Sequence, residues 1–138
     1  MVRQLSVFLE NKKGRVNDIL SIISDSGINI VSVSLADTSD FGILRLLCNA
    51  PEEAHNMLKE KGITSKITDV VAVCVPHEVG SLKKVIYAIT NAGISINYIY
   101  GLSLNDDGAS IAMKTSDHAK TIEVLNELGV KMFNQEDL

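Results

Sequence analysis

The stretch "ENKKGRVNDILSIISDSGINI", residues 10–30, decides the fold of this chain. After Gly14, apolar residues recur at the i, i+3, i+4 and i+7 positions, which is the spacing of one buried helical face. Gly27 then ends the helix, since glycine adopts the left-handed conformation of a helix C-terminus at little cost. The stretch therefore predicts a glycine turn, an amphipathic helix and a following strand.

A second copy of this pattern, "HEVGSLKKVIYAITNAGISI", occupies residues 77–96. Gly80 overlays Gly14 at a separation of 66 positions (80 − 14), and Gly93 overlays Gly27. A period-two apolar pattern precedes each copy and predicts a strand. A β-rich run, a turn and a further strand follow each copy, which indicates an antiparallel hairpin in both halves.

The same shift of 66 places Gly42 over Gly108 in the two hairpin turns. The glycines that end the second helix of each half, Gly62 and Gly129, are 67 positions apart (129 − 62), so an extra residue is expected around that helix. Pro51 suits the first turn of the earlier of these two helices.

Ser116 or Asp117 is the expected N-cap of the later second helix. After Gly62, "ITSKITDVVAVCV" supplies a fourth strand that continues almost directly into the first strand of the next half. The chain is therefore divided into residues 1–69 and 70–138 with hardly any linker.

Each half reads β-α-β-β-α-β, which predicts an α+β protein made of two ferredoxin-like units. Each unit is an antiparallel four-stranded sheet with both helices on one face. A unit of about 66 residues buries only ~60% of its unfolded surface, so further pairing is expected, and a homodimer is the expected form.

Composition narrows the classes of partner. A net charge of −4 and the absence of Trp argue against nucleic acid binding. The N-terminus lacks the apolar region of a signal peptide, and no apolar run is long enough to cross a bilayer, so we expect a cytoplasmic protein without membrane contact. Cys48 and Cys74 lie in apolar strand-like runs without CxxC spacing. We expect buried, reduced thiols, no metal and no cofactor.

Gly14 and Gly80 allow two interpretations. The structural interpretation is that the turn needs a backbone conformation that only glycine adopts cheaply. The functional interpretation is that the exposed N–H groups of the helix start, at the positive end of the helix dipole, bind a carboxylate or phosphate that approaches closely because no side chain intervenes. Composition and spacing leave both open.

The stretch "ENKKGRVNDILSIISDSGINIVSVS" resembles an ACT domain, whose hallmark is Asn or an acidic residue three positions before a glycine and an apolar helix that ends in "GINI". The second half, "PHEVGSLKKVIYAITNAGISINYIY", is similar but has His77 and Ser95 where the family usually has Asn or Asp and Asn. The resemblance covers nearly the whole chain as two ACT units without a catalytic domain. It implies a free amino acid as ligand and regulation of an enzyme of amino-acid metabolism.

The resemblance also implies two ligand pockets, each built from the strand-to-helix loop of one unit and the start of the second strand of another. One pocket would use Asn11, Lys12, Lys13, Gly14, Arg15 and Val16 with Ser95, Ile96 and Asn97. The reciprocal pocket would use His77, Glu78, Val79, Gly80, Ser81 and Leu82 with Asn29, Ile30 and Val31. The loops differ, so the pockets are not expected to be equivalent, and the first loop is favoured because it keeps the family's Asn.

Three functional hypotheses follow. The leading one is a non-enzymatic, allosteric amino-acid sensor, and the alternative is a regulatory subunit that acts by docking on a biosynthetic enzyme without its own ligand. An enzyme is disfavoured, because the sequence has no nucleophile beside a base, no GxxxxGK[ST] and no GxGxxG motif.

Several polar and aromatic side chains receive ordinary interpretations. His77 and Glu78 are adjacent on a loop without the third group that a metal site or a catalytic acid–base pair would need. His55 and His118 are interpreted as surface residues near the starts of the second helices. Tyr98 and Tyr100 lie two apart and predict a covered sheet face, with a ligand lid as the lesser alternative.

Overall fold

The computed structural model describes residues 1–10, 12–37, 40–104 and 107–138. The chain divides into two compact units, which are described separately. The first unit comprises Arg3–Thr68 with Leu138, and the second comprises Asp69–Asp137 with Met1–Val2.

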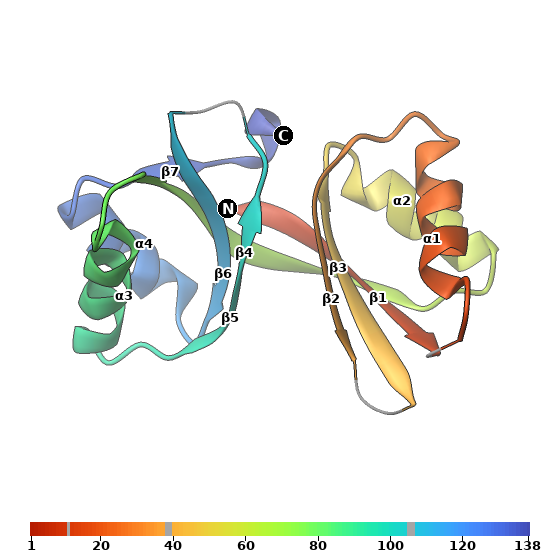
Figure 1. The fold of residues 1–138 in the computed structure, drawn as a ribbon, viewed down its shortest axis with the longest axis horizontal. Coiled ribbons are helices and arrows are strands. Elements are labelled where there is room, and N and C mark those ends of the chain that lie inside the picture. Colours follow the sequence, from red (N-terminus) through yellow and green to blue (C-terminus); the bar gives the residue numbers. More distant parts are fainter. Residues whose placement is uncertain (11, 38–39, 105–106) are drawn as a thin grey trace. The chain divides into compact units, whose positions relative to one another are not determined.

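The first unit has the predicted order of elements. Its helices and strands are β1 (Val2–Glu10), α1 (Arg15–Ser24), β2 (Ile30–Asp37), β3 (Phe41–Cys48), α2 (Pro51–Glu60) and the beginning of β4 (Ser65–Pro76). The strand order is β2-β3-β1-β4, and both helices lie on one face of this sheet (Figure 1).

The second unit repeats this arrangement. Its elements are the remainder of β4, then α3 (Ser81–Asn91), β5 (Ile96–Leu102), β6 (Gly108–Thr115), α4 (His118–Glu127), β7 (Lys131–Phe133) and a short 3₁₀ turn, η1 (Gln135–Asp137). The strand order is β5-β6-β4-β7, again with both helices on one face (Figure 1). The predicted antiparallel hairpins are confirmed in both units, as is the near absence of a linker, because β4 runs unbroken from one unit into the other.

Strand register corrects one detail of the predicted repeat. β1 pairs Val7 with Leu44, and β4 pairs Val73 with Ile111. The first partners are 66 positions apart (73 − 7), but the second partners are already 67 apart (111 − 44). The extra residue therefore lies before the third strand and not around the second helix. The overlay of Gly42 on Gly108 was wrong by one position, and Gly42 is equivalent to Ala109.

Each unit packs its helices on its sheet through its own apolar core. In the first unit, Ile19 and Ile23 of α1 and Leu58 of α2 are buried against alternate residues of β1 and β3. In the second unit, Val85, Ile89 and Leu125 occupy the equivalent positions. The helix stripes that the sequence predicted are therefore the ones that pack.

The helix ends follow the predicted signals. α2 begins at Pro51, and α4 is capped by Asp117, whose carboxylate accepts a hydrogen bond of 3.0 Å from the N–H of Lys120. Gly27, Gly62, Gly93 and Gly129, which end the four helices, all have positive φ angles. In the described part of the chain, no helix is long and apolar enough to cross a membrane.

The interpretation of the two histidines of the second helices as surface residues was wrong. His55 is half-buried because its Nδ1 lies 2.7 Å from the hydroxyl of Ser65 at the start of β4. His118 is also half-buried, and its Nε2 has no hydrogen-bond partner among the described residues. Tyr98 and Tyr100 are half-buried and stack with ring centroids 6.4 Å apart.

Candidate functional site

The two strand-to-helix loops have the same backbone conformation. Gly14 has φ 83° and ψ −4°, and Gly80 has φ 86° and ψ −3°. A Cβ atom on either glycine would meet no atom within 4 Å. Positive φ, and not lack of space, is therefore what selects glycine at both loops.

The hydrogen bonds of the loops repeat as closely as their torsion angles. In each loop, the N–H group two residues before the glycine donates a hydrogen bond to the carbonyl of the last strand residue. The N–H groups one and four residues after the glycine donate to carbonyl oxygens of the loop. The bonds are Lys12 N to Glu10 O (2.8 Å), Arg15 N to Lys12 O (3.2 Å) and Asp18 N to Gly14 O (3.0 Å), and their counterparts are Glu78 N to Pro76 O (2.8 Å), Ser81 N to Glu78 O (3.2 Å) and Lys84 N to Gly80 O (3.1 Å).

At both helix starts, some N–H groups have no acceptor among the described residues. Neither α1 nor α3 has a side-chain cap from the described residues. The N–H groups of Val16 and Asn17, and likewise those of Leu82 and Lys83, have no acceptor in the described part of the chain. Free N–H groups at the positive end of a helix form a site that favours an anion.

The first loop carries positive charge around this helix start. The ammonium of Lys12 lies 2.6 Å from the carboxylate of Glu10, and this contact, with a smaller contribution from Arg15, lowers the pKa of Glu10. Lys13 is exposed, whereas Arg15 is half-buried at the first helical position. Asn11, the residue that the family resemblance favoured in this loop, lies outside the described residues.

The second loop is more open and less charged. His77, Glu78, Val79 and Gly80 are all exposed, and the side chain of Val79 is fully accessible to solvent. Leu82, which follows the loop, is 42% exposed. Ser81 is half-buried at the start of α3. The two loops thus share a backbone but present different side chains.

The predicted strand starts are also built alike. Asn29 and Asn49 exchange two hydrogen bonds, and Ser95 and Ser116 exchange the equivalent pair. These bonds fix the beginning of β2 and of β5 against the residue that follows the third strand of the unit.

Each strand start also contains an irregularity of register. It falls between Ile30 and Ser32 in β2 and between Ile96 and Tyr98 in β5. Val31 and Asn97 are therefore the bulged residues, and both belong to the predicted site. Bulges re-aim side chains and are frequent beside functional sites. Ile30 and Ile96 pack on the cores of their units instead.

Within one unit, the loop and the strand start lie at opposite ends of one helix. Gly14 precedes α1 and Asn29 follows it, and a helix of 10 residues is about 15 Å long. The same holds for Gly80 and Ser95 around α3. A single unit therefore does not form a pocket from its own loop and its own strand start.

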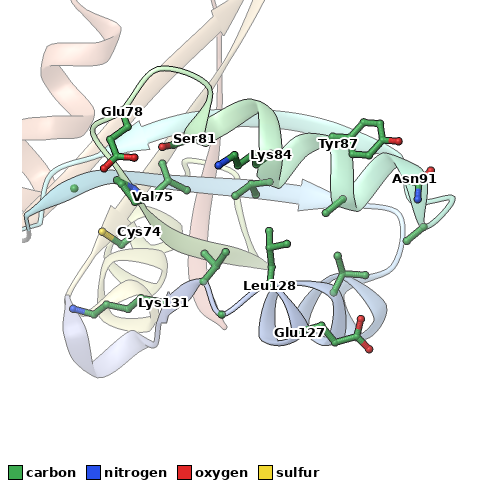
Figure 2. Close-up of a pocket in the computed structure, with 18 of the residues that line it drawn as sticks. Cys74, Val75, Glu78, Ser81, Lys84, Tyr87, Asn91, Glu127, Leu128 and Lys131 are labelled. Atoms are coloured by element: carbon green, nitrogen blue, oxygen red, sulfur yellow. The ribbon is translucent and has the colours of Figure 1, made fainter.

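A groove that the sequence interpretation missed lies in the second unit, between α3 and α4 (Figure 2). Its volume is about 1250 Å³. Glu78 and Ser81 are the two predicted site residues that line it. The signal that could have found it is the pair Ala88 and Val124, small residues at inward positions of two facing helices.

The whole chain, residues 1–138, matches the family model described as an ACT domain pair. The chain therefore belongs to the ACT domain family, and its two units are a pair of such domains. No curated protein gives a significant match.

Solved structures agree with this assignment. Protein BT0572 from Bacteroides thetaiotaomicron is 35% identical with a TM-score of 0.92, over 99% of this chain and 94% of that one. The ligand-free regulatory subunit of aspartate kinase from Thermus thermophilus has a TM-score of 0.63 at 11% identity, and the one from Thermus flavus has 0.62 at 14%. These subunits share the fold over 91% of this chain, and over 91% and 90% of their own lengths.

Proposed function

We propose that this ACT domain pair is a non-catalytic regulatory protein that binds a free amino acid at its strand-to-helix loops. The observation that carries the proposal is the repeated helix start, with a left-handed glycine and with two N–H groups and a cap position that find no partner among the described residues. An α-amino acid supplies the carboxylate for such N–H groups, and its ammonium would bind side-chain oxygens such as those of Asn29 or Glu78.

The proposed pockets combine a loop from one unit with a bulged strand start from another unit, in the same chain or in a second copy. The first would use Lys12–Val16 with Ser95–Asn97, and the second would use His77–Leu82 with Asn29–Val31. This arrangement makes ligand binding depend on how units pair. It is the physical basis for an allosteric effect, typically ~1–3 kcal/mol, on a partner enzyme of amino-acid metabolism.

The fold shared with regulatory subunits of aspartate kinase supports a regulatory role of this kind. Cys48, which is buried, and Cys74, which is half-buried, form no disulfide among the described residues, which supports our proposal of a reducing, cytoplasmic setting. We expect a homodimer that acts without a cofactor.

The test is calorimetry and thermal unfolding of the full chain against each of the twenty amino acids. We expect one amino acid to bind and to raise the unfolding temperature, because a ligand at ~100 times its dissociation constant adds about 2.7 kcal/mol. Absence of binding by every amino acid at millimolar concentration would contradict the proposal.

Two matched variants separate ligand binding from folding. Gly14→Asn keeps a residue type that tolerates positive φ, and its side chain enters open space, so the fold should persist. The new side chain would obstruct the free N–H groups of Val16 and Asn17. We expect affinity to fall at least tenfold with little change in unfolding temperature. Unchanged affinity in both Gly14→Asn and Gly80→Asn would show that neither loop is the site.

A second function, docking on an enzyme without a ligand, is favoured by one observation. The first unit exposes Phe8 and Phe41 on the sheet face opposite its helices, with Phe41 63% exposed, whereas the exposed Val33 and Leu35 lie on the other face. Exposed apolar clusters are typical of protein interaction surfaces. Purification from native extract distinguishes the two functions, since a chain that is isolated alone and binds an amino acid would exclude docking as the sole activity.

A further inference from the structure

The groove of the second unit is distinct from the N–H groups of the helix starts, but it shares Glu78 and Ser81 with the second loop. It runs along one stripe of α3 and faces the end of α4 and the start of β7 (Figure 2). All the residues that line it belong to the second unit. Ligand pockets commonly measure ~300–1000 Å³, so a groove of about 1250 Å³ can hold a molecule larger than the smallest amino acids.

Two of the residues that line the groove are smaller than their equivalents in the first unit. Ala88 of α3 is equivalent to Ile22 of α1, and Val124 of α4 is equivalent to Met57 of α2. Ile22 and Met57 are half-buried against the first core. Ala88 and Val124 line the groove, and Val124 also packs against the second core. Alanine and valine at these two positions leave more room above the core than isoleucine and methionine would.

One end of the groove is polar. Ser81 and Lys84 are three positions apart on α3 and so lie on the same helical face. The N–H of Ser81 donates a hydrogen bond of 3.2 Å to the carbonyl oxygen of Glu78, which keeps the backbone of Glu78 beside them. Figure 2 shows the ammonium of Lys84 directed toward the Ser81 end. Among the residues that the structure describes, Lys84 makes no ion pair.

This polar end offers one cation, one anion and one hydroxyl beside an apolar floor. A doubly negative ligand is disfavoured, because Glu78, Asp107 and Glu127 line the groove together with only two lysines, Lys84 and Lys131. A zwitterion with an apolar body matches both parts, since its charges find opposite charges at one end and its body covers apolar surface.

We infer that this groove binds a free α-amino acid with a large apolar side chain. The carboxylate binds Lys84 and the hydroxyl of Ser81, the ammonium binds Glu78, and the side chain lies over Ala88 and Val124. The inference rests on the proposed function for the class of ligand, but it places that ligand within one unit and not at a loop shared between units.

The experiment fills the groove with the residues that the first unit already uses. In the double variant Ala88→Ile and Val124→Met, both new side chains have a precedent at equivalent positions, so the fold should be kept. Phenylalanine is the probe for titration of the full chain. We expect the double variant to bind it at least tenfold more weakly than the wild type.

Analogues and a second variant test the polar end. Alanine lacks the large side chain, 3-phenylpropanoate lacks the ammonium and phenethylamine lacks the carboxylate. Each is expected to bind at least tenfold more weakly than phenylalanine. Lys84→Met should have the same effect and Lys84→Arg should restore binding. Lys84 is exposed, so these variants remain informative even if the double variant fails to fold.

The outcomes separate the groove from the loops. Binding that is lost in the groove variants supports the groove, and if Gly14→Asn and Gly80→Asn then keep their affinity, the loops are excluded as the site. Binding that survives the double variant and Lys84→Met but is lost in a glycine variant overturns the groove and leaves the proposed function standing. No binding of phenylalanine to the wild type, with another amino acid bound at the loops, also overturns the groove.

Discussion

The two units share a backbone to within a few degrees at their loops, yet their surfaces differ. The first unit has Lys12, Lys13 and Arg15 around its helix start, and the second has Glu78, Val79 and Ser81 in the same places. The first unit packs Ile22 and Met57 against its core at the positions where the second has Ala88 and Val124, which line the groove. The two units therefore repeat their main-chain geometry, while the side chains that determine their binding chemistry differ.

The strongest test of this equivalence is a pair of core truncations. Ile23 and Ile89 occupy the same position of α1 and α3 and are both 0% exposed. Ile23→Ala and Ile89→Ala should each lower the free energy of unfolding by ~2–5 kcal/mol, because each leaves a cavity in its core. Denaturant unfolding of the full chain measures both values. A loss in one variant below about 1 kcal/mol would break the equivalence of the two cores.

A glycine pair should respond differently in the two units. A Cβ atom at Gly108 would lie 2.4 Å from the carbonyl oxygen of Val75, whereas the nearest atom to one at Gly42 is Leu35 Cδ1 at 3.4 Å. Gly108→Ala should therefore cost ~1–3 kcal/mol of stability through overpacking. Gly42→Ala should cost less than about 1 kcal/mol, since Ala109 occupies the equivalent position. Equal costs would show that the two β-hairpins tolerate substitution alike.

The second helices differ in how they begin. Asp117 caps α4, whereas the residue before α2 is Ala50, which packs on the first core and provides no side-chain cap. Asp117→Ala should lower stability by ~1 kcal/mol, and Asp117→Asn should retain most of it. Thermal unfolding followed by circular dichroism measures the difference. Identical unfolding temperatures for the two variants would argue against the cap.

The smallest expected effect is one of pH on the second unit. Burial, followed by the charge of Lys114, lowers the pKa of His118, while Asp69 and Asp117 oppose this shift. The unfolded chain then binds the proton more readily, so stability is present above the ordinary value of 6.5 and is lost as pH falls through the folded pKa.

Unfolding midpoints of the wild type and His118→Gln at pH 8 and about pH 5.5 measure this contribution. The wild type should lose more stability on acidification than the variant. If the variant loses as much stability on acidification as the wild type does, His118 is not the cause of the pH dependence. The equivalent position of the first unit is Pro51, which does not titrate.

Most of the fold could be predicted from spacing. A turn, a helix and the buried face of that helix were predicted in each half from the apolar stripe and the glycines that flank it, which are Gly14 and Gly27 in the first half and Gly80 and Gly93 in the second. The position of the extra residue could not be predicted, because Gly42 and Gly108 aligned by chance and only the hydrogen-bonded register of β3 and β6 shows the shift. The half-burial of His55 depends on a contact with Ser65 in another element, which periodicity does not report.

Less of the candidate site could be predicted. The loops were visible because glycine marks an unusual torsion angle, but the bulges at Val31 and Asn97 leave no mark in a β-rich run. The groove was missed because Ala88 and Ile22 are both apolar and therefore fit the pattern of an amphipathic helix equally well. The groove depends on side-chain volume, and a difference in side-chain volume is found only when the two copies are compared position by position.

The unbroken strand β4 has a practical consequence for anyone who wishes to study the domains singly. Its residues Ser65–Thr68 belong to one unit and Asp69–Pro76 to the other, and the opening residues Met1–Val2 are grouped with the later unit. A gene cut at any codon of this strand would deprive at least one product of hydrogen-bonding partners at a sheet edge. The smallest form suitable for expression is accordingly the tandem, and a domain exchange between relatives should carry both domains together.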